Sequence, residues 1–183
     1  MEYHEPWRTQ IGQQVIKDID EERAITEIFS SPQMAQWGAD EQEIISEEHT
    51  PYLWRLRREV IVPAVLQYTK DCWDYPIDES TMSYHSWAVH GHNNAGIEPH
   101  IHGHSLLTTV LYLAAAPGDL TLMDPRGAAC RSYPTPVRRG YFANHHISPT
   151  TGMMVIFPCY IPHYVLPHPG EFRVALTTDF TFG

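Results

Sequence analysis

The first third of the chain has apolar residues at helical spacing. Residues 13–29 place apolar side chains three and four positions apart, with acidic residues between them. This pattern predicts one amphipathic helix that ends at the Ser-Ser-Pro sequence of residues 30–32. A second helix is predicted from about residue 51 to residue 73, and Pro63 should kink it or split it in two. We expect both helices to pack as a layer against a sheet.

From Met82 onward the pattern changes to short β-rich runs separated by Gly, Pro and Asn turns. The runs are residues 83–89, 106–114, 119–124, 152–158, 163–167 and 172–182. Their regular spacing, without long helices between them, predicts an antiparallel sandwich or barrel. Residues 125–147, rich in Gly, Pro and Arg, predict a long loop.

These patterns together predict an α+β fold. The 183 residues fit one domain, 1–183, with a helical layer over residues 1–78 and a β core over residues 79–183.

Charge and cysteine content restrict the class of protein. The formal net charge is −10, and residues 1–50 carry twelve acidic against three basic residues, which disfavours a surface for nucleic acid or anionic membrane. No apolar run is long enough to span a membrane, and no secretory signal is visible. Three widely spaced cysteines fit a reducing compartment, so we expect a cytoplasmic protein. A homodimer through the acidic helices is compatible with the sequence, because twofold pairs are the commonest assembly.

Histidine is the most unusual feature of the composition. Of twelve histidines, ten fall between His85 and His168. His100, His102 and His104 alternate, and alternate residues of a strand share one face, so the three rings could point together into the mouth of a barrel. Imidazole is the commonest protein ligand of first-row transition metals, which makes a metal site the leading interpretation. The alternative is a cluster of polar residues at a strand end.

Two further residues follow in the last third. An apolar run over residues 156–162 ends in a turn flanked by prolines, and His163 follows directly after this turn. Arg173 comes ten residues later, inside the apolar run of residues 172–176. A buried guanidinium needs a partner, and a dicarboxylate cosubstrate would be a bidentate one. The alternative is an arginine at the rim, paired with Glu171 or Asp179.

The order and spacing of these motifs resemble those of the iron(II)/2-oxoglutarate oxygenases. More narrowly, the chain is similar to a small family of such oxygenases that is related to aspartyl β-hydroxylases. The matching stretches are residues 86–89, 99–102, 107–113, 157–160 with His163, and 173–179. The resemblance covers roughly residues 80–180. It implies a double-stranded β-helix core, also called a jelly roll or cupin-like core, and an enzyme that uses Fe(II), 2-oxoglutarate and O2.

The resemblance also implies the metal and cosubstrate residues. His100, His102 and His163 would be the catalytic metal ligands, with His102 at the position where the superfamily usually has Asp or Glu. His104 is a rival ligand. Arg173 would bind the 5-carboxylate of 2-oxoglutarate.

The sequence departs from the family near that arginine. Ala175 stands where many relatives have a Ser hydroxyl that shares the cosubstrate carboxylate. Thr108, Tyr112 or Thr177 could supply the missing hydroxyl.

Further residues are candidates for contact with the substrate. His90 and His92 precede the His motif and could line the mouth of the site together with His104. Arg126 could meet a substrate carboxylate, although Asp124 and Pro125 beside it equally fit a simple turn.

The expected function is a dioxygenase that hydroxylates a small molecule, such as an amino acid or a carboxylate-like compound, because the short chain has no added substrate domain. One alternative is a three-His cupin-type dioxygenase that does not use 2-oxoglutarate. Another is a non-catalytic jelly-roll protein that binds a metal or ligand. Replacement of Arg173 distinguishes the 2-oxoglutarate-dependent enzyme from the three-His dioxygenase. Anaerobic iron titration with 2-oxoglutarate distinguishes both enzymes from the non-catalytic binding protein.

Overall fold

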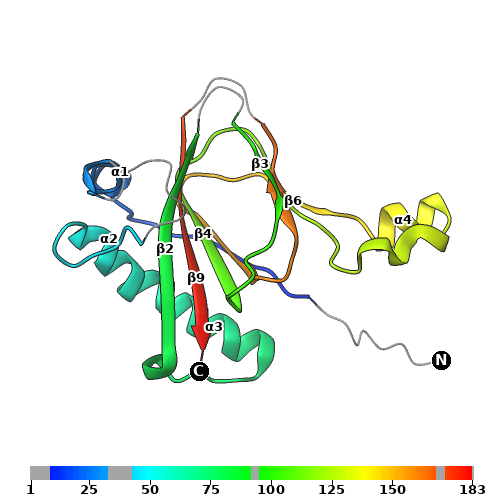
Figure 1. Ribbon diagram of the computed structural model, residues 1–183, viewed down its shortest axis with the longest axis horizontal. Helices are drawn as coiled ribbons and strands as arrows, with labels where there is room; N and C mark the ends of the chain where they lie inside the picture. Colours follow the sequence, from blue (N-terminus) through cyan, green and yellow to red (C-terminus); the bar gives the residue numbers. More distant parts are fainter. Residues whose placement is uncertain (1–8, 33–42, 92–94, 168–171, 183) are drawn as a thin grey trace.

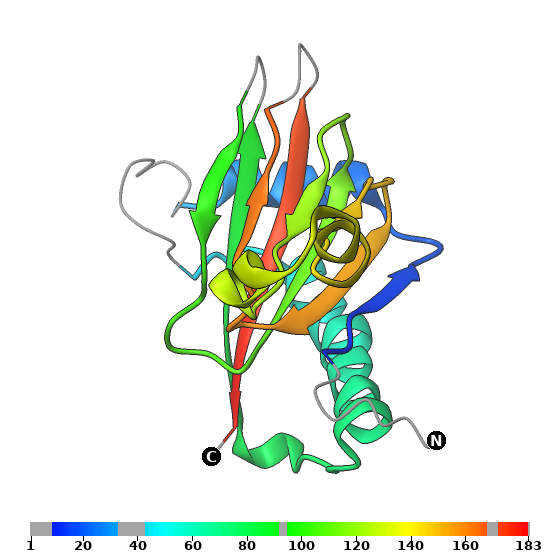
Figure 2. The ribbon, with the colours of Figure 1, turned by 90° about the vertical axis from the view of Figure 1, so that its right-hand side faces the viewer.

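Two antiparallel sheets form the centre of the computed structural model, which describes residues 9–32, 43–91, 95–167 and 172–182 (Figures 1 and 2). The larger sheet has the strand order β1-β7-β4-β9-β2, and the smaller has the order β3-β8-β5-β6. The strand bounds are β1 Gly12–Val15, β2 Met82–Gly91, β3 Ile97–His100, β4 Leu107–Ala114, β5 Leu120–Leu122, β6 His145–Ile147, β7 Met153–Pro158, β8 His163–Val165 and β9 Arg173–Phe182. The α+β class predicted from the sequence is confirmed.

Helices from the first third of the chain cover the outer face of the larger sheet (Figure 1). They are α1 Glu21–Ser30, α2 Pro51–Leu56, a π-helical turn Arg57–Ile61 and α3 Val62–Trp73. Their apolar faces and the even-numbered side chains of β9 share one core, which contains Ile28, Leu53, Val65, Leu176 and Phe180. A second, smaller core lies between the two sheets. The alternation of β9 therefore supplies apolar side chains to the helices and leaves its odd-numbered side chains for the space between the sheets.

The predicted helix over residues 13–29 is wrong in its first half. Gly12–Val15 form β1, an edge strand that pairs with β7, and α1 begins only at Glu21. Asp18 has a positive φ of 65°, and the Asp20 carboxylate caps α1 by accepting from the Arg23 N–H at 3.0 Å. Local periodicity could not reveal β1, because its partner strand lies about 140 residues further along the chain.

The second predicted helix is present over residues 51–73, and its geometry changes where the sequence suggested a kink. A π-helical turn, Arg57–Ile61, lies directly before Pro63, which occupies the first turn of α3. Proline has no N–H and crowds the carbonyl four residues earlier, and a wide π turn is one way to accommodate this. No helix among the described residues is long and apolar enough to cross a membrane.

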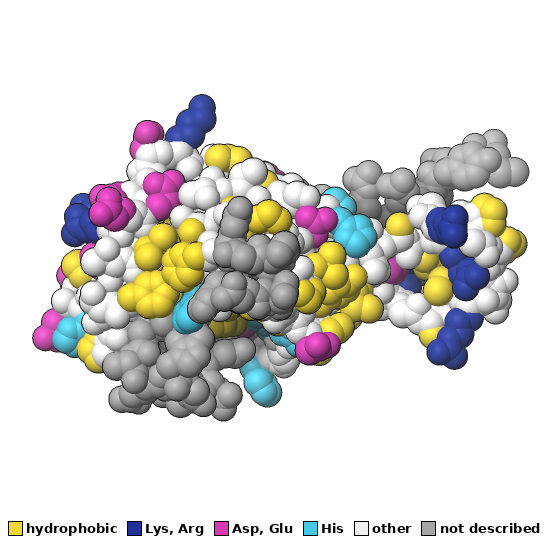
Figure 3. Space-filling view, turned by 90° about the horizontal axis from the view of Figure 1, so that it is seen from above, with side chains coloured by type: hydrophobic (Ala, Val, Ile, Leu, Met, Phe, Trp, Pro, Cys, Tyr) yellow, Lys and Arg dark blue, Asp and Glu magenta, His cyan; other side chains and the backbone are white. Residues whose placement is uncertain are grey.

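The predicted long loop over residues 125–147 contains regular structure. It forms a 3-10 helix, Gly127–Ser132, the short helix α4 Thr135–Tyr141, and strand β6. The helical part projects away from the sheets (Figure 1), and its arginines gather on this projection in the space-filling view (Figure 3). Residues 131–141 are all exposed, so α4 has no apolar stripe from which a helix could be predicted.

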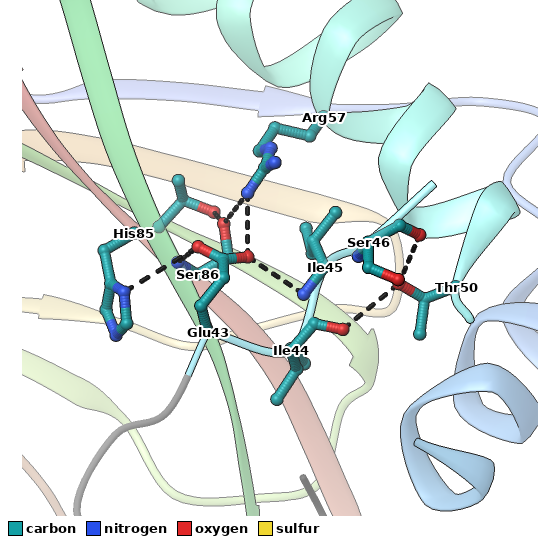
Figure 4. Close-up of polar contacts among 9 residues, drawn as sticks. Glu43, Ile44, Ile45, Ser46, Thr50, Arg57, His85 and Ser86 are labelled. Carbon is teal, nitrogen blue, oxygen red and sulfur yellow. Dashed lines mark hydrogen bonds and ion pairs between the residues drawn. The ribbon is translucent and has the colours of Figure 1, made fainter. Parts of the chain in front are cut away.

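A polar network fastens the segment before α2 to the edge strand β2 (Figure 4). The Arg57 guanidinium donates to the Glu43 carboxylate at 2.9 Å and to the Ser86 hydroxyl at 3.1 Å. The Ser86 backbone N–H donates to the same carboxylate at 2.8 Å, and the Ile44 N–H donates to the Ser86 carbonyl at 2.9 Å. These contacts satisfy part of the exposed edge of β2, the strand that carries Trp87 toward the space between the sheets.

Candidate metal and cosubstrate site

A cavity of about 110 Å³ lies between the two sheets. Its walls are mostly apolar, with three histidines, one tyrosine and one arginine as the ionisable groups. The lining residues are Trp87, Val89, Ile97, His100, His102, Val110, Tyr112, Leu120, His163, Val165, Arg173, Ala175 and Thr177. The larger sheet contributes alternate residues of β2, β4 and β9, because residues two apart in a strand share a face. None of these lining residues carries a carboxylate.

Three histidines from separate segments meet at this cavity. His100 ends β3 and pairs in register with His163, which begins β8. His102 lies in the loop after β3, where its backbone N–H donates to the Cys159 carbonyl at 3.2 Å. One ring nitrogen from each of the three lies within 4.8 Å of the others. The sequence prediction that His100, His102 and His163 come together therefore agrees with the structure.

Hydrogen bonds determine which nitrogen of His100 and His163 faces the cluster. The Nδ1 atom of His100 lies 2.8 Å from the Glu98 carbonyl, and that of His163 lies 3.0 Å from the Ile161 carbonyl. A carbonyl oxygen only accepts, so each Nδ1 carries the proton and donates it. A neutral ring protonated at Nδ1 has its free lone pair on Nε2.

His102 follows the same rule with a carboxylate as acceptor. Its Nδ1 atom lies 2.8 and 2.9 Å from the two oxygens of Asp179. Its Nε2 atom lies 3.2 Å from Nε2 of His163. Two neutral rings that each donate through Nδ1 cannot hydrogen-bond to one another through Nε2, so two lone pairs face each other. Two nitrogens bound to one metal ion at about 2.1 Å and at right angles lie about 3 Å apart, which is close to this separation.

His163 is held neutral by its surroundings. Only 4% of its surface is exposed, and burial lowers the pKa of its imidazole to about 4, with the neighbouring His100 and His102 acting in the same direction. A neutral imidazole is the form that binds a metal ion.

Arg173 lines the same cavity and is 3% exposed. Its Nη1 atom is buried and makes no hydrogen bond within the described residues. Burial lowers the pKa of its guanidinium. Of the two carboxylates suggested by the sequence as partners of this arginine, Asp179 bonds to His102 instead, and Glu171 lies outside the described residues. A buried guanidinium nitrogen that has no hydrogen-bond partner among the described residues fits an anionic ligand in the cavity.

The three hydroxyl candidates lie in two different places. Tyr112 and Thr177 line the cavity with Arg173, and burial raises the pKa of the Tyr112 phenol. The Thr108 hydroxyl instead donates to the Asp179 carboxylate. Thr108 therefore lies behind His102, while Tyr112 and Thr177 remain the candidates for a cosubstrate contact.

Strand alternation does not explain the His motif. Strand β3 ends at His100, so His102 reaches the cluster through a loop, and His104 in the following turn is exposed and lies outside the cluster. A backbone that leaves the sheet after His100 removes the period-two relation among the three rings.

His90 and Arg126, which the sequence suggested as substrate contacts, are not among the residues that line the cavity. His90 packs against the rings of Phe29 and Phe172, with ring centroids 5.2 and 6.4 Å away. Asp124 and Pro125 form a turn, as the alternative interpretation predicted, in which the Gly127 N–H donates to the Asp124 carbonyl at 3.2 Å. The Arg126 guanidinium pairs with the Asp124 carboxylate and also lies over the rings of Tyr141 and Phe142. His92 lies outside the described residues. Substrate contact by these histidines and by Arg126 stays a prediction.

The sequence analysis missed two residues of the site, Asp179 and Trp87. Asp179 lies six residues after Arg173 in β9, so the same period-two pattern that orients Arg173 also turns Asp179 toward the histidines. Trp87 packs against His102, with ring centroids 5.5 Å apart and ring planes tilted by 32°. Its position in β2, opposite Thr177, follows from a register that only the structure reveals.

Comparisons with known proteins match this arrangement. A sequence model of the family described as "Putative 2OG-Fe(II) oxygenase" matches residues 85–179. That match spans both sheets from β2 to β9 and includes His100, His102, His163 and Arg173. No curated protein sequence gives a significant match to the chain.

Solved structures share the fold at low sequence identity. A prolyl-4-hydroxylase from Pseudomonas putida is 16% identical, with a TM-score of 0.59, covering 96% of this chain and 89% of that one. A viral collagen prolyl hydroxylase from Paramecium Bursaria Chlorella virus-1, solved as a 2OG complex, is 11% identical, with a TM-score of 0.61 and coverages of 93% and 94%. The alpha-ketoglutarate-dependent epimerase SnoN from nogalamycin biosynthesis is 12% identical, with a TM-score of 0.60 and coverages of 96% and 78%. These likenesses confirm the double-stranded β-helix fold.

Proposed function

Because the chain belongs to the 2OG-Fe(II) oxygenase family, and is thus a 2-oxoglutarate-dependent non-haem iron oxygenase, we propose that His100, His102 and His163 hold the Fe(II) and that Arg173 binds the far carboxylate of 2-oxoglutarate. One observation carries this proposal. Three imidazole lone pairs converge in a cavity that also contains the guanidinium of Arg173, whose buried Nη1 atom has no hydrogen-bond partner among the described residues.

The donor set supports the metal assignment. Each ring donates through Nδ1 to an oxygen that can only accept, which leaves three Nε2 atoms directed at one region. When bound there, Fe(II) supplies the activation of O2, while 2-oxoglutarate is consumed as succinate and carbon dioxide. Three ligands on one side leave coordination positions for cosubstrate and oxygen. The apolar walls of the cavity limit the access of water to that region.

The arginine supports the cosubstrate assignment. Arg173 is the only cation among the residues that line the cavity, and its guanidinium fork matches a carboxylate. Tyr112 and Thr177 line the same cavity and are candidates to replace the serine hydroxyl that many relatives have where this chain has Ala175.

We further propose a small substrate, an amino acid or a carboxylate-like compound, hydroxylated by a single domain of residues 1–183. The cavity of about 110 Å³ leaves little room beside a bound dicarboxylate, which favours a substrate that presents one small group. Three free cysteines support a cytoplasmic location for this enzyme. The two alternatives, a dioxygenase without 2-oxoglutarate and a non-catalytic binding protein, do not fit a member of this family.

Anaerobic titration tests the proposed residues. Fe(II) and 2-oxoglutarate added together to the purified protein should produce a visible charge-transfer band, and admission of O2 should yield succinate. Arg173→Ala should lose the band at cosubstrate concentrations that saturate the native protein. Arg131→Ala is the control, because it removes an exposed arginine of the 3-10 helix Gly127–Ser132, and it should keep the band. A native-like titration in Arg173→Ala would contradict the cosubstrate assignment. Addition of amino acids and short carboxylates should then increase succinate formation if the substrate class is right.

A further inference from the structure

We propose that Asp179 is a positioning residue for the metal site, a buried carboxylate behind His102 that orients this ring and supplies a negative charge that three imidazoles lack. The inference rests on the proposed function, because it concerns the ligand set proposed there. It adds a residue that contributes to metal affinity without lining the cavity.

The contacts of Asp179 fix the ring of His102. Its two carboxylate oxygens lie 2.8 and 2.9 Å from Nδ1 of His102, and both side chains are mostly buried, 12% and 8% exposed. Imidazole Nδ1 can meet this carboxylate only as a donor, so Nε2 is left without a proton. A histidine ligand whose second nitrogen donates to a carboxylate is held in one tautomer and one orientation, and it becomes a more basic ligand.

The carboxylate is itself held in place. Thr108 faces Asp179 in the register of β4 and β9, and its hydroxyl donates to that carboxylate. Both residues lie in central strands of the larger sheet, whereas His102 lies in a loop. The larger sheet therefore gives rigid support to His102, a proposed ligand that lies in a loop and not in a strand.

The hydrogen bond from His102 to Asp179 determines which nitrogen of the His102 ring faces the cluster, because the aromatic contacts of the ring do not. His102 packs against Trp87 at 5.5 Å, with the two ring planes tilted by 32°, and stacks on His100 at 5.3 Å between centroids. Stacking restricts the plane of a ring, but it does not distinguish Nδ1 from Nε2. The bond to Asp179 makes that distinction.

Charge gives Asp179 a second effect. Three neutral imidazoles leave a divalent ion with its full charge, in a cavity whose only other ionised group is the cation of Arg173. The Asp179 carboxylate, separated from the ion by one hydrogen bond and the ring of His102, would lower the electrostatic cost of placing a dication there. The usual carboxylate ligand of the superfamily is thus replaced by a carboxylate that acts through His102.

Cobalt(II) binding provides a test that does not depend on turnover. Co(II) is added anaerobically, without 2-oxoglutarate, to the full chain and to Asp179→Asn and Asp179→Ala, and its visible absorption reports binding. Asparagine keeps the shape and one acceptor oxygen but removes the charge, so affinity should fall about 10-fold, and alanine should approach a 100-fold loss. Asp20→Asn is the matched control, since it removes a carboxylate charge from the helical layer while an asparagine still caps α1.

The outcomes separate the inference from the function on which it rests. If the wild type binds Co(II) and both Asp179 variants bind it with the same affinity and keep the same thermal stability, the positioning role of Asp179 is overturned, but the metal assignment is not. Failure of the folded wild type to bind Co(II) would overturn the metal assignment and this inference together. Cys159 also lies near His102 and Asp179. A second equivalent of Co(II) with a thiolate band that disappears in Cys159→Ser would show that Asp179 is a ligand of another ion, which likewise overturns the proposal.

Discussion

The Nε2 atoms of His102 and His163 lie 3.2 Å apart, although 61 positions separate the two residues in the sequence. Each ring donates its Nδ1 proton elsewhere, His102 to Asp179 and His163 to the Ile161 carbonyl. In the neutral state no proton lies between the two nitrogens, so their lone pairs repel one another. A bound cation converts this repulsion into attraction, which makes the pair the most specific feature of the site.

Loss of either His100 or His163 should therefore remove metal binding. We expect the Co(II) or Fe(II) affinity of His100→Ala and of His163→Ala to fall by more than about 100-fold, because a lost ligand costs more than a lost outer partner. Anaerobic metal titration measures this effect. His104→Ala is the control, since His104 belongs to the same motif but is exposed outside the cluster, and its affinity should be native. Equal losses in all three variants would argue against the assigned ligand set.

Arg173 should affect the cosubstrate and not the metal. Loss of a charge-assisted, largely desolvated pair costs about 2–5 kcal/mol, so the apparent 2-oxoglutarate affinity of Arg173→Ala should fall roughly 30- to several-thousand-fold. Arg173→Lys should recover part of this, because an ammonium group provides charge without the planar fork. Succinate formation against 2-oxoglutarate concentration measures the change, with metal affinity as the internal control. An unchanged concentration dependence in Arg173→Ala would mean that another group binds the cosubstrate.

The hydroxyl candidates should separate into two classes. Thr177→Val and Tyr112→Phe should weaken 2-oxoglutarate binding, because both side chains line the cavity with Arg173. Thr108→Val should instead weaken metal affinity, because its hydroxyl bonds to Asp179. A net hydrogen bond to a charged group contributes about 1.5–3 kcal/mol, which corresponds to roughly a 10- to 100-fold effect. The same two titrations, performed on all three variants, measure both constants. Loss of cosubstrate affinity in Thr108→Val alone would reverse this assignment.

The sequence predicted those parts of the fold that depend on local pattern. The runs that became β2, β4, β7 and β9 alternate or are continuously apolar, and the helix over residues 51–73 has a clear apolar face. Strand β1 was missed because an edge strand of four residues is defined by its partner and not by its own period. The 3-10 helix Gly127–Ser132 and the helix α4 were missed because none of their side chains is buried, so they have no apolar stripe.

The candidate site shows the same division. His100, His163 and Arg173 could be found from residue type and spacing together with the family resemblance. His102 lies in the cluster, but it reaches the cluster through a loop and not by the strand alternation from which the sequence argument began. The period-two pattern of β9 places Asp179 on the same face as Arg173, but its bond to His102 depends on the register of β9 against β4 and on the side-chain rotation of His102, which no local pattern encodes.

The Glu43–Arg57–Ser86 network should contribute to the stability of the fold, although none of its residues lines the cavity of the proposed metal site. Glu43→Ala would leave the Arg57 guanidinium with one partner fewer and free the Ser86 N–H at the edge of β2. Because the Glu43 side chain is one-third exposed, we expect a loss of about 1–3 kcal/mol in the free energy of unfolding, below the value for a fully buried pair. Urea unfolding of the metal-free protein measures it. Glu59→Ala, an exposed acidic residue of the adjoining helical turn, should change the free energy by less than about 0.5 kcal/mol.

The pH dependence of the metal-free protein should report the burial of His163. Burial lowers the pKa of its imidazole to about 4, whereas the same group in the unfolded chain titrates near its ordinary value of about 6.5. Between these values the unfolded chain binds a proton that the folded protein does not, so the free energy of unfolding rises with pH across this window. The stability is fully present above about pH 6.5 and is lost as the pH falls toward 4, by up to about 3 kcal/mol. His163→Gln cannot titrate there, so its stability should fall less between pH 7 and pH 5, by a difference of about 2 kcal/mol. Urea unfolding of both proteins at the two pH values, with a chelator present, measures this difference, and parallel losses would show that His163 is not the group responsible.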